Sequence, residues 1–300
     1  MKSRLVSMVL LLLAGVLIWQ LADFRKPLDA TLTPVFELVG KPISHADTVL
    51  SKALPIGDLD EKQMGEAIKK KFAQRKQRAL RDERYVNNLI KYLVLFKVKP
   101  FAYRAFVIKS SAINAFALPG GVILVTSGLL RNLKNEAQLM AVLAHEMGHI
   151  ERSHCFKAVK GQLLLKKVEL ETLGKFVDFS LALMFRHSFS KTQEAEADSY
   201  ALKLLKRSRY HVGALAGSFR LMLSKSARGE RQPDLLRDYF ASHPPLKLRV
   251  ARFEALARGF VKNNPGYRRY LGAKNLKRRK TFSQKNYQNE WFSAAGRAGN

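Results

Sequence analysis

Residues 138–154 read QLMAVLAHEMGHIERSH, and this stretch decides both the fold and the chemistry. Its apolar residues and the preceding Asn135, a good N-cap residue, predict a helix. A step of four residues along a helix returns to the same face, so His145 and His149 can present ring nitrogens to one metal ion. Glu146 is turned about 100° away, towards a water molecule on that ion. The stretch therefore predicts a metal-binding helix that carries its own base.

The spacing of this motif is rarely met by chance, and it leaves the metal site incomplete. The chain has 300 residues and only 7 His, and residue frequencies give roughly 0.01 expected matches to His-Glu-x-x-His. Two imidazoles are too few ligands for zinc. Cys155 is the single cysteine, so the next ligand has to be another His or a carboxylate. A single cysteine also excludes an intramolecular disulfide and a redox Cys-x-x-Cys pair.

The best candidate for the missing ligand lies in residues 193–198, QEAEAD. Glu194 and Asp198 are four residues apart and share one helical face, whereas Glu196 points elsewhere. One carboxylate could bind the metal while the other accepts the second N–H of a ligating histidine. The spacing does not decide between the two, and the acidic first turn of a solvated helix would have the same composition.

Four segments together resemble the zinc endopeptidases of metallopeptidase family forty-eight, the gluzincins that include the CAAX prenyl, HtpX-like and BepA-like proteases. The segments are NAFALPGG (114–121), AVLAHEMGH (141–149), QEAEAD (193–198) and SHPPLKLRV (242–250). They follow the order and spacing of the family over roughly residues 60–258. The resemblance implies an α+β, zincin-like (gluzincin) fold that is mostly helical and has a small sheet of short strands.

The resemblance also implies a role for each residue of the motifs. His145, His149 and Glu194 would bind one Zn²⁺ per chain, and Glu146 would act as the general base and acid of peptide-bond hydrolysis. The family pattern is Glu-x-x-x-Asp, so Asp198 would hold a ligand in place without binding the metal itself.

Two further histidines lie close to these motifs in the sequence. His243 stands in SHPP, and its resemblance to a loop histidine of BepA-like members implies that it can approach the metal. It would then either cap the zinc in a latent state or hydrogen-bond the reacting oxyanion, and the alternative is a histidine that only packs against the helix. His154 is five residues beyond His149, off the ligand face, and is predicted to be a structural residue at the helix end.

The chain divides into four segments by composition. Residues 1–22 contain the uncharged run LVSMVLLLLAGVLIWQL, a signal anchor or a cleaved signal peptide, and residues 23–57 form a connector rich in proline. Residues 58–260 are the predicted metallopeptidase domain, and residues 261–300 are a basic tail, predicted to be poorly ordered or loosely docked. Lys2 and Arg4 precede the apolar run, which favours a membrane-anchored protein with an exported catalytic domain. In a bacterium the exported catalytic domain would lie in the periplasm. The alternative is that the apolar run is cleaved and the protein is secreted or periplasmic.

Short strands are expected within residues 102–127, arranged as a meander and separated by serines and by Pro119-Gly120-Gly121. An edge strand near 114–118 could pair with an extended substrate through main-chain hydrogen bonds. The segments expected to be helical lie within residues 61–96, 136–154, 157–185, 192–206, 211–223 and 246–258.

The charge of the chain is its most unusual bulk property. Lys and Arg total 53 against 24 Asp and Glu, a formal net charge of +29, and much of the excess lies in residues 69–84 and 262–300. The residues at 69–84 would form a solvated helix face or a surface for anionic lipid, and the tail would hold the domain against an anionic membrane. No nucleic-acid partner is expected, because no recognition motif accompanies the charge.

The predicted function is zinc-dependent endoproteolysis of misfolded or membrane-associated proteins, as in protein quality control, with protein or peptide substrates. The alternative is a membrane-tethered basic binding protein whose peptidase-like domain is not catalytic. The intact HEMGH motif, residues 145–149, argues against that alternative.

Overall fold

A computed structural model describes residues 61–76, 78–166, 173–185, 188–226, 243 and 246–293. The predicted anchor and connector, residues 1–57, lie outside this part of the chain. None of the helices that the structure describes is both long and apolar enough to cross a membrane.

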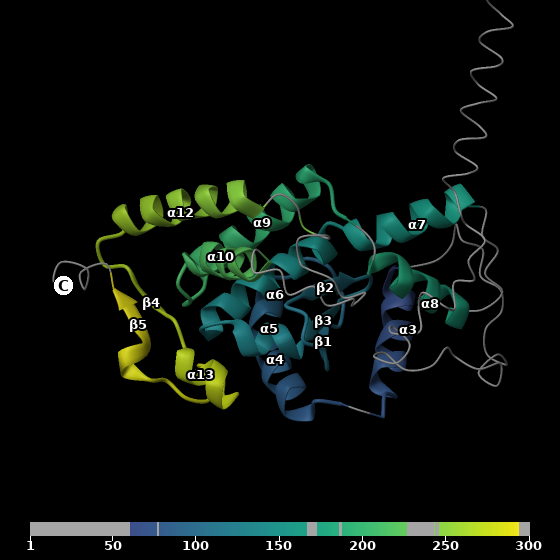
Figure 1. Ribbon diagram of the computed structural model, residues 1–300, viewed down its shortest axis with the longest axis horizontal. Helices are drawn as coiled ribbons and strands as arrows, with labels where there is room; N and C mark the ends of the chain where they lie inside the picture. Colours follow the sequence, from purple (N-terminus) through teal and green to yellow (C-terminus); the bar gives the residue numbers. More distant parts are fainter. Residues whose placement is uncertain are drawn as a thin grey trace, which may run out of the picture. The chain divides into compact units, whose positions relative to one another are not determined.

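The described residues form a mostly helical α+β structure with two small sheets (Figure 1). The helices are α3 (Glu61–Ala73), α4 (Leu80–Leu93), α5 (Ser127–Asn132), α6 (Glu136–Glu151), α7 (His154–Lys166), α8 (Leu173–Met184), α9 (Lys191–Arg207), α10 (Ala214–Ser226), α12 (Leu246–Lys262) and α13 (Ala273–Arg278), with 3₁₀ turns η3 (Val94–Phe96) and η4 (Gln288–Glu290). The strands are β1 (Arg104–Ile108), β2 (Ala115–Leu118), β3 (Val122–Thr126), β4 (Arg268–Tyr270) and β5 (Trp291–Ser293).

The three-stranded sheet has the order β1-β3-β2, so it differs from the expected meander. β2 and β3 form an antiparallel pair in which Ala117 faces Ile123, and the turn between them uses Gly120 at φ 71°. A side chain is strained at that φ, and a Cβ on Gly120 would also lie 2.4 Å from the Cα of Gly65. β1 pairs with the other side of β3 and runs parallel to it. β2 therefore lies at an edge of the sheet, as predicted for residues 114–118.

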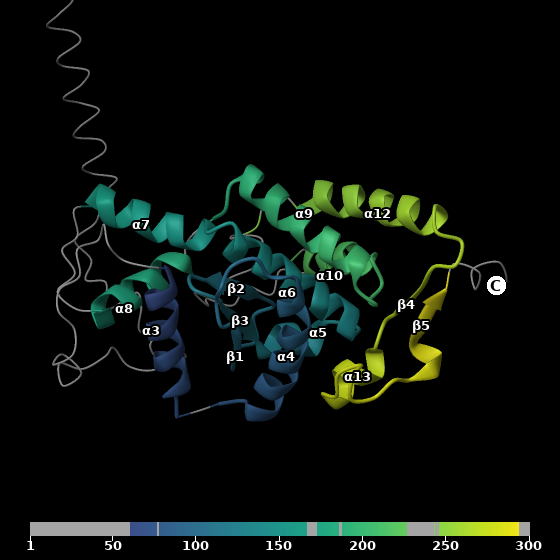
Figure 2. The ribbon, with the colours of Figure 1, turned by 180° about the vertical axis from the view of Figure 1, so that it is seen from behind.

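Helix α6 is the centre of the domain, with β2 and β3, α9, α10 and α7 packed around it (Figure 2). Asn135 caps the helix by accepting a hydrogen bond from the backbone N–H of Gln138, which confirms the predicted N-terminus. Every residue from Glu136 to Ile150 is buried. A helix that is covered on all sides needs apolar residues all round, and this explains why residues 138–150 show little amphipathic pattern.

Helices α6 and α9 approach each other closely at Gly148. A Cβ built on Gly148 would lie 2.9 Å from the Cα of Ala197 and 3.0 Å from its carbonyl oxygen. Both contacts involve backbone atoms, so no rotamer change could relieve them. The glycine in HEMGH thus permits the approach that places Glu194 and Asp198 beside the two histidines of α6.

The segment after α12 is folded onto the domain, so the prediction of a loosely docked tail is wrong for residues 263–293. β4 and β5 pair, and α13 lies beside α6 (Figure 1). Glu136 joins the parts, because its carboxylate accepts hydrogen bonds from the hydroxyls of Tyr85 and Tyr210 at 2.7 Å each and from the backbone N–H of Phe282 at 2.9 Å. Burial raises the pKa of Glu136 to about 7, and these three donors oppose the shift. This docking could not be inferred from the sequence, because the charge of the tail alone suggested that it is solvated.

The basic stretch 69–84 is also more internal than the sequence suggested. Lys69, Lys71 and Arg75 are buried. Arg75 bonds Glu83 at 2.9 Å, and Lys71 forms an ion pair with Asp178 of α8. These three cations are therefore not available to a lipid surface. Lys70, Lys76, Arg81 and Arg84 of the same stretch are exposed, so a solvated face or a lipid-facing surface there stays a prediction.

We predict that Gly148→Ala destabilises the fold by about 1–3 kcal/mol, because the new methyl group forces α6 and α9 apart. Urea unfolding of the metal-free protein would measure this. Gly259→Ala is the matched control, since Gly259 is an exposed residue of α12 whose Cβ would meet nothing within 4 Å. That change should stabilise the fold by up to about 1 kcal/mol. Equal effects of the two substitutions would contradict the packing argument.

Candidate metal centre

Four side chains from three separate parts of the chain converge at the middle of α6. His145 and His149 come from α6, Glu194 from the first turn of α9, and His243 from the segment before α12. Each offers one ligand atom, and these four atoms lie within 4.8 Å of one another. All four residues are at most 1% exposed. The structure thus brings together every residue predicted to bind or approach the metal.

The distances within this group fit a single tetrahedral ion. The Nε2 atoms of His145 and His149 are 3.2 Å apart, and the Nε2 of His149 lies 3.4 Å from Oε1 of Glu194. His243 Nδ1 lies 3.4 Å from His145 Nε2 and 2.8 Å from Glu194 Oε1. Zinc–nitrogen bonds of about 2.0–2.1 Å in a tetrahedron place ligand atoms about 3.3 Å apart. The donor set and its spacing therefore suit Zn²⁺.

Protonation in this group follows from burial and from the neighbouring charges. Burial lowers the pKa of His149 well below its usual value, which favours the neutral ring that binds metals. Burial acts to raise the pKa of Glu194, but the pKa is lowered overall because His243, His149 and His145 face this carboxylate. The pKa of His243 is raised despite burial by the carboxylates of Glu194 and Glu146. Glu194 is therefore the anion of the cluster.

Glu146 lies beside the cluster without belonging to it. Its side chain is fully buried, and neither carboxylate oxygen has a hydrogen-bond partner among the described residues. Its Oε1 is 3.7 Å from His243 Nε2. Burial raises the pKa of Glu146, although His243 and His145 oppose the shift. A buried carboxylate without a partner is costly, so its placement next to a metal cluster points to a use in chemistry.

Asp198 and Arg249 hold the cluster from behind. Asp198 Oδ1 lies 3.0 Å from Nδ1 of His145, the ring nitrogen that faces away from the cluster. Arg249 of α12 grips both oxygens of Asp198 at 2.7 and 2.8 Å, pairs with Glu194 at 2.5 Å and donates to the carbonyl of His243 at 3.1 Å. One guanidinium thus fixes three parts of the site, as its planar fork of donors allows. Sequence reasoning missed Arg249, although it lies in the SHPPLKLRV segment.

His154 has a more specific position than the predicted helix-end role. It is the first residue of α7, and its Nδ1 lies 3.0 Å from Nδ1 of His149. Its Nε2 lies 2.8 Å from Oε2 of Glu196. If Nε2 of His149 binds a metal, its Nδ1–H donates to His154, which in turn donates to Glu196. The sharp turn that starts α7, with Ser153 at φ 55°, makes this possible, and helical spacing alone could not reveal it.

Comparison with known proteins agrees with these observations. The model of Peptidase family M48 matches residues 76–257. The chain is 30% identical over 152 residues to the mitochondrial metalloendopeptidase OMA1 of Arabidopsis thaliana, which is 49% of this chain and 30% of that protein.

Two relatives from Escherichia coli (strain K12) are similar in the same way. The beta-barrel assembly-enhancing protease is 29% identical over 188 residues, 56% of this chain and 37% of that protein. The metalloprotease LoiP is 32% identical over 154 residues, 48% of this chain and 59% of that protein. The matched part thus spans less than two thirds of each relative.

We predict that His154→Ala weakens zinc binding about 10- to 100-fold, because the ring of His149 loses the group that fixes its orientation. Competition with a zinc-chelating dye would measure the change. His211→Ala is the control, since His211 bonds the hydroxyl of Tyr267 and has no contact with the cluster among the described residues. An unchanged zinc affinity in His154→Ala would show that His154 only packs there.

Proposed function

The chain belongs to peptidase family M48, and on this basis we propose that it is a zinc-dependent metalloendopeptidase with a gluzincin-type fold. Family M48 is a family of zinc metallopeptidases. The observation that carries the proposal is the convergence of His145, His149 and Glu194 with the unpartnered carboxylate of Glu146 beside them. No observation favours a non-catalytic binding protein, because every residue that the chemistry needs is present.

The proposed chemistry is hydrolysis of a peptide bond. Zinc held by His145, His149 and Glu194 would act as a Lewis acid and lower the pKa of a water molecule to about 7. Glu146 takes a proton from the attacking water and later gives it to the departing amine. The raised pKa of Glu146 suits this exchange, because a base that is poised nearer neutral pH can also return the proton. Asp198 holds the ring of His145 in the required tautomer.

The proposed substrates are polypeptides in an extended conformation. β2 is an edge strand, and α6 packs against it, so a peptide added beside residues 115–118 would run close to the cluster. Main-chain hydrogen bonds recognise a backbone rather than a sequence. Loose specificity of this kind suits quality control of misfolded or membrane-associated proteins, in a membrane-anchored enzyme with an exported domain. The beta-barrel assembly-enhancing protease among its relatives supports such a role.

We propose that His243 caps the site in a latent state. Its Nδ1 completes the group of four ligand atoms, in the position that a water molecule would need. The four ligands and Glu146 are nearly inaccessible to solvent, so this arrangement is closed to substrate. Of the three roles considered from the sequence, the position of Nδ1 among the ligand atoms supports the cap over the oxyanion contact and over packing alone. Withdrawal of the His243 ring from the cluster would free the fourth ligand position.

We predict that Glu146→Gln lowers casein cleavage by at least about 10²-fold, because the amide cannot take a proton, while zinc remains bound. A fluorogenic casein assay and metal analysis of the purified protein would test this. Glu66→Gln on the exposed face of α3 is the control and should leave the rate unchanged. Wild-type cleavage should also stop with a chelator and return with zinc. Near-normal cleavage by Glu146→Gln would rule out its proposed role.

We predict that His243→Ala raises the basal rate of casein cleavage several-fold, because it vacates the fourth ligand position. Zinc affinity should fall in the same variant, since one donor is lost. A fall in kcat with unchanged zinc affinity would instead assign His243 to the oxyanion and contradict the cap.

A further inference from the structure

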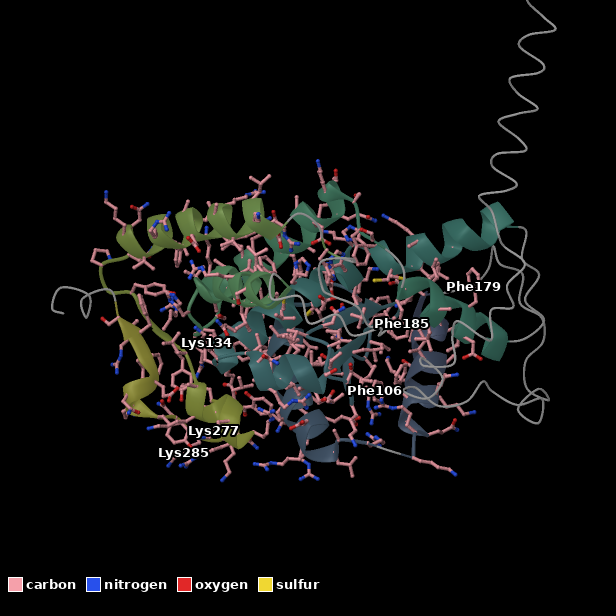
Figure 3. All side chains as sticks on the ribbon, viewed as in Figure 1. Phe106, Lys134, Phe179, Phe185, Lys277 and Lys285 are labelled. Atoms are coloured by element: carbon pink, nitrogen blue, oxygen red, sulfur yellow. The ribbon has the colours of Figure 1, made fainter. Side chains whose placement is uncertain are left out.

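A strongly basic hollow lies on the opposite side of α6 from the α7 end of the domain, between the α5–α6 connection and α13. It has a volume of about 600 Å³. Cationic side chains surround it, and Figure 3 labels two of them, Lys134 and Lys277, on the side of the molecule formed by α13. We call it the basic hollow and define it by its lining, Leu130, Arg131, Leu133, Lys134, Ala273, Lys274, Leu276, Lys277, Arg279 and Glu290.

The basic hollow contains more cations than carboxylates that could neutralise them, within the described part of the chain. Its carboxylate, Glu290, already accepts hydrogen bonds from the backbone N–H groups of Ala273 and Lys274. Arg279 is engaged by Asp82 at 2.7 Å. Lys134, Lys274 and Lys277 are exposed and have no carboxylate within 4.0 Å in the described part of the chain. Three exposed ammonium groups around one concavity attract an anion with several oxygen atoms, such as a phosphate group.

The floor and the surroundings of the basic hollow select among phosphate-bearing ligands. Leu133 and Leu276 are buried beneath it, so the hollow can also accept apolar atoms next to the phosphate. Exposed cations continue beyond it along the same segment, at Arg278, Lys280 and Lys285. A broad positive face around an amphipathic hollow fits the surface of an anionic bilayer better than a single small anion. The apolar run at residues 5–21 would keep such a surface within reach.

We propose that the basic hollow binds the phosphate headgroup of an anionic phospholipid and so docks the catalytic domain on an anionic bilayer. This replaces the loosely docked tail predicted from charge with a folded site. The site is attached directly to the metal-binding helix, because Lys134 immediately precedes the N-cap of α6 and the N–H of Glu136 donates to the carbonyl of Gly272 at 3.0 Å. Docking there would fix the orientation of α6 relative to the membrane. The proposal does not depend on peptidase activity.

The test uses the full chain in nanodiscs, which expose both faces of the bilayer. One set contains phosphatidylcholine alone and the other an equal mixture of phosphatidylcholine and phosphatidylglycerol. Amide hydrogen exchange is followed in residues 130–134 and 273–279, which surround the basic hollow. We expect exchange there to slow by at least about tenfold in the anionic discs only, and the effect to disappear at high salt.

Two triple variants with the same change in net charge separate site binding from general attraction. Lys134→Gln with Lys274→Gln and Lys277→Gln should lose the protection. Lys91→Gln with Lys203→Gln and Lys247→Gln removes exposed lysines from α4, α9 and α12 and should keep it. All six side chains are exposed, so near-UV circular dichroism should show both variants folded.

Three results would overturn the proposal. The first is equal exchange in the two kinds of nanodisc. The second is an equal loss of protection in both triple variants, which would assign the effect to net charge. The third is the same protection from inorganic phosphate without anionic lipid, which would make the ligand a free anion. Because the readout is binding, a failed proteolysis assay would leave this result interpretable.

Discussion

The close approach of α6 and α9 at Gly148 is the constraint on which the rest of the site depends. Two histidines on one helix can share an ion, but the third ligand has to come from another element. That element can deliver a short glutamate side chain only if the helix backbones nearly touch. Glycine at 148 and alanine at 197 permit this contact. The same packing places Asp198 behind His145 and Glu196 within reach of His154. One contact between small residues thus fixes the positions of Glu194, Asp198 and Glu196 around the histidines.

Bringing these groups together concentrates buried carboxylates, and the structure compensates for each of them differently. Glu194 and Asp198 are neutralised by Arg249 and by the histidines they face. Glu136, at the other end of α6, accepts hydrogen bonds from two tyrosine hydroxyls and a backbone amide, and burial raises its pKa to about 7 although these donors oppose the shift. Among the described residues, Glu146 has no hydrogen-bond partner and no lysine or arginine within 4.0 Å, and its Oε1 lies 3.7 Å from His243 Nε2. This least compensated carboxylate is the one to which we assign the chemistry, as expected where stability is sacrificed for function.

The site was more predictable from the sequence than its surroundings. Helical periodicity and residue chemistry place His145, His149 and Glu146 correctly on one helix, and the family pattern selects Glu194 over Glu196. The placement of the first three residues needs only local geometry, whereas the choice of Glu194 rests on the resemblance to the family. Arg249, His154 and the order of the sheet escaped prediction because they depend on contacts between distant segments. The tail was misjudged for a related reason: its anchoring residue, Glu136, lies far away in the sequence, and nothing in residues 262–293 reveals it.

The net charge of +29 acquires two separate meanings once the structure is considered. Some cations are internal and neutralise carboxylates whose burial without a partner would destabilise the fold. Arg75, Lys71 and Arg249 are examples. Cations such as Lys134, Lys274 and Lys277 gather on one side, where they repel one another unless an anion is present. That repulsion does not stabilise the fold. The exposed cations that have no internal carboxylate to pair with are therefore the ones that argue for an anionic partner outside the chain.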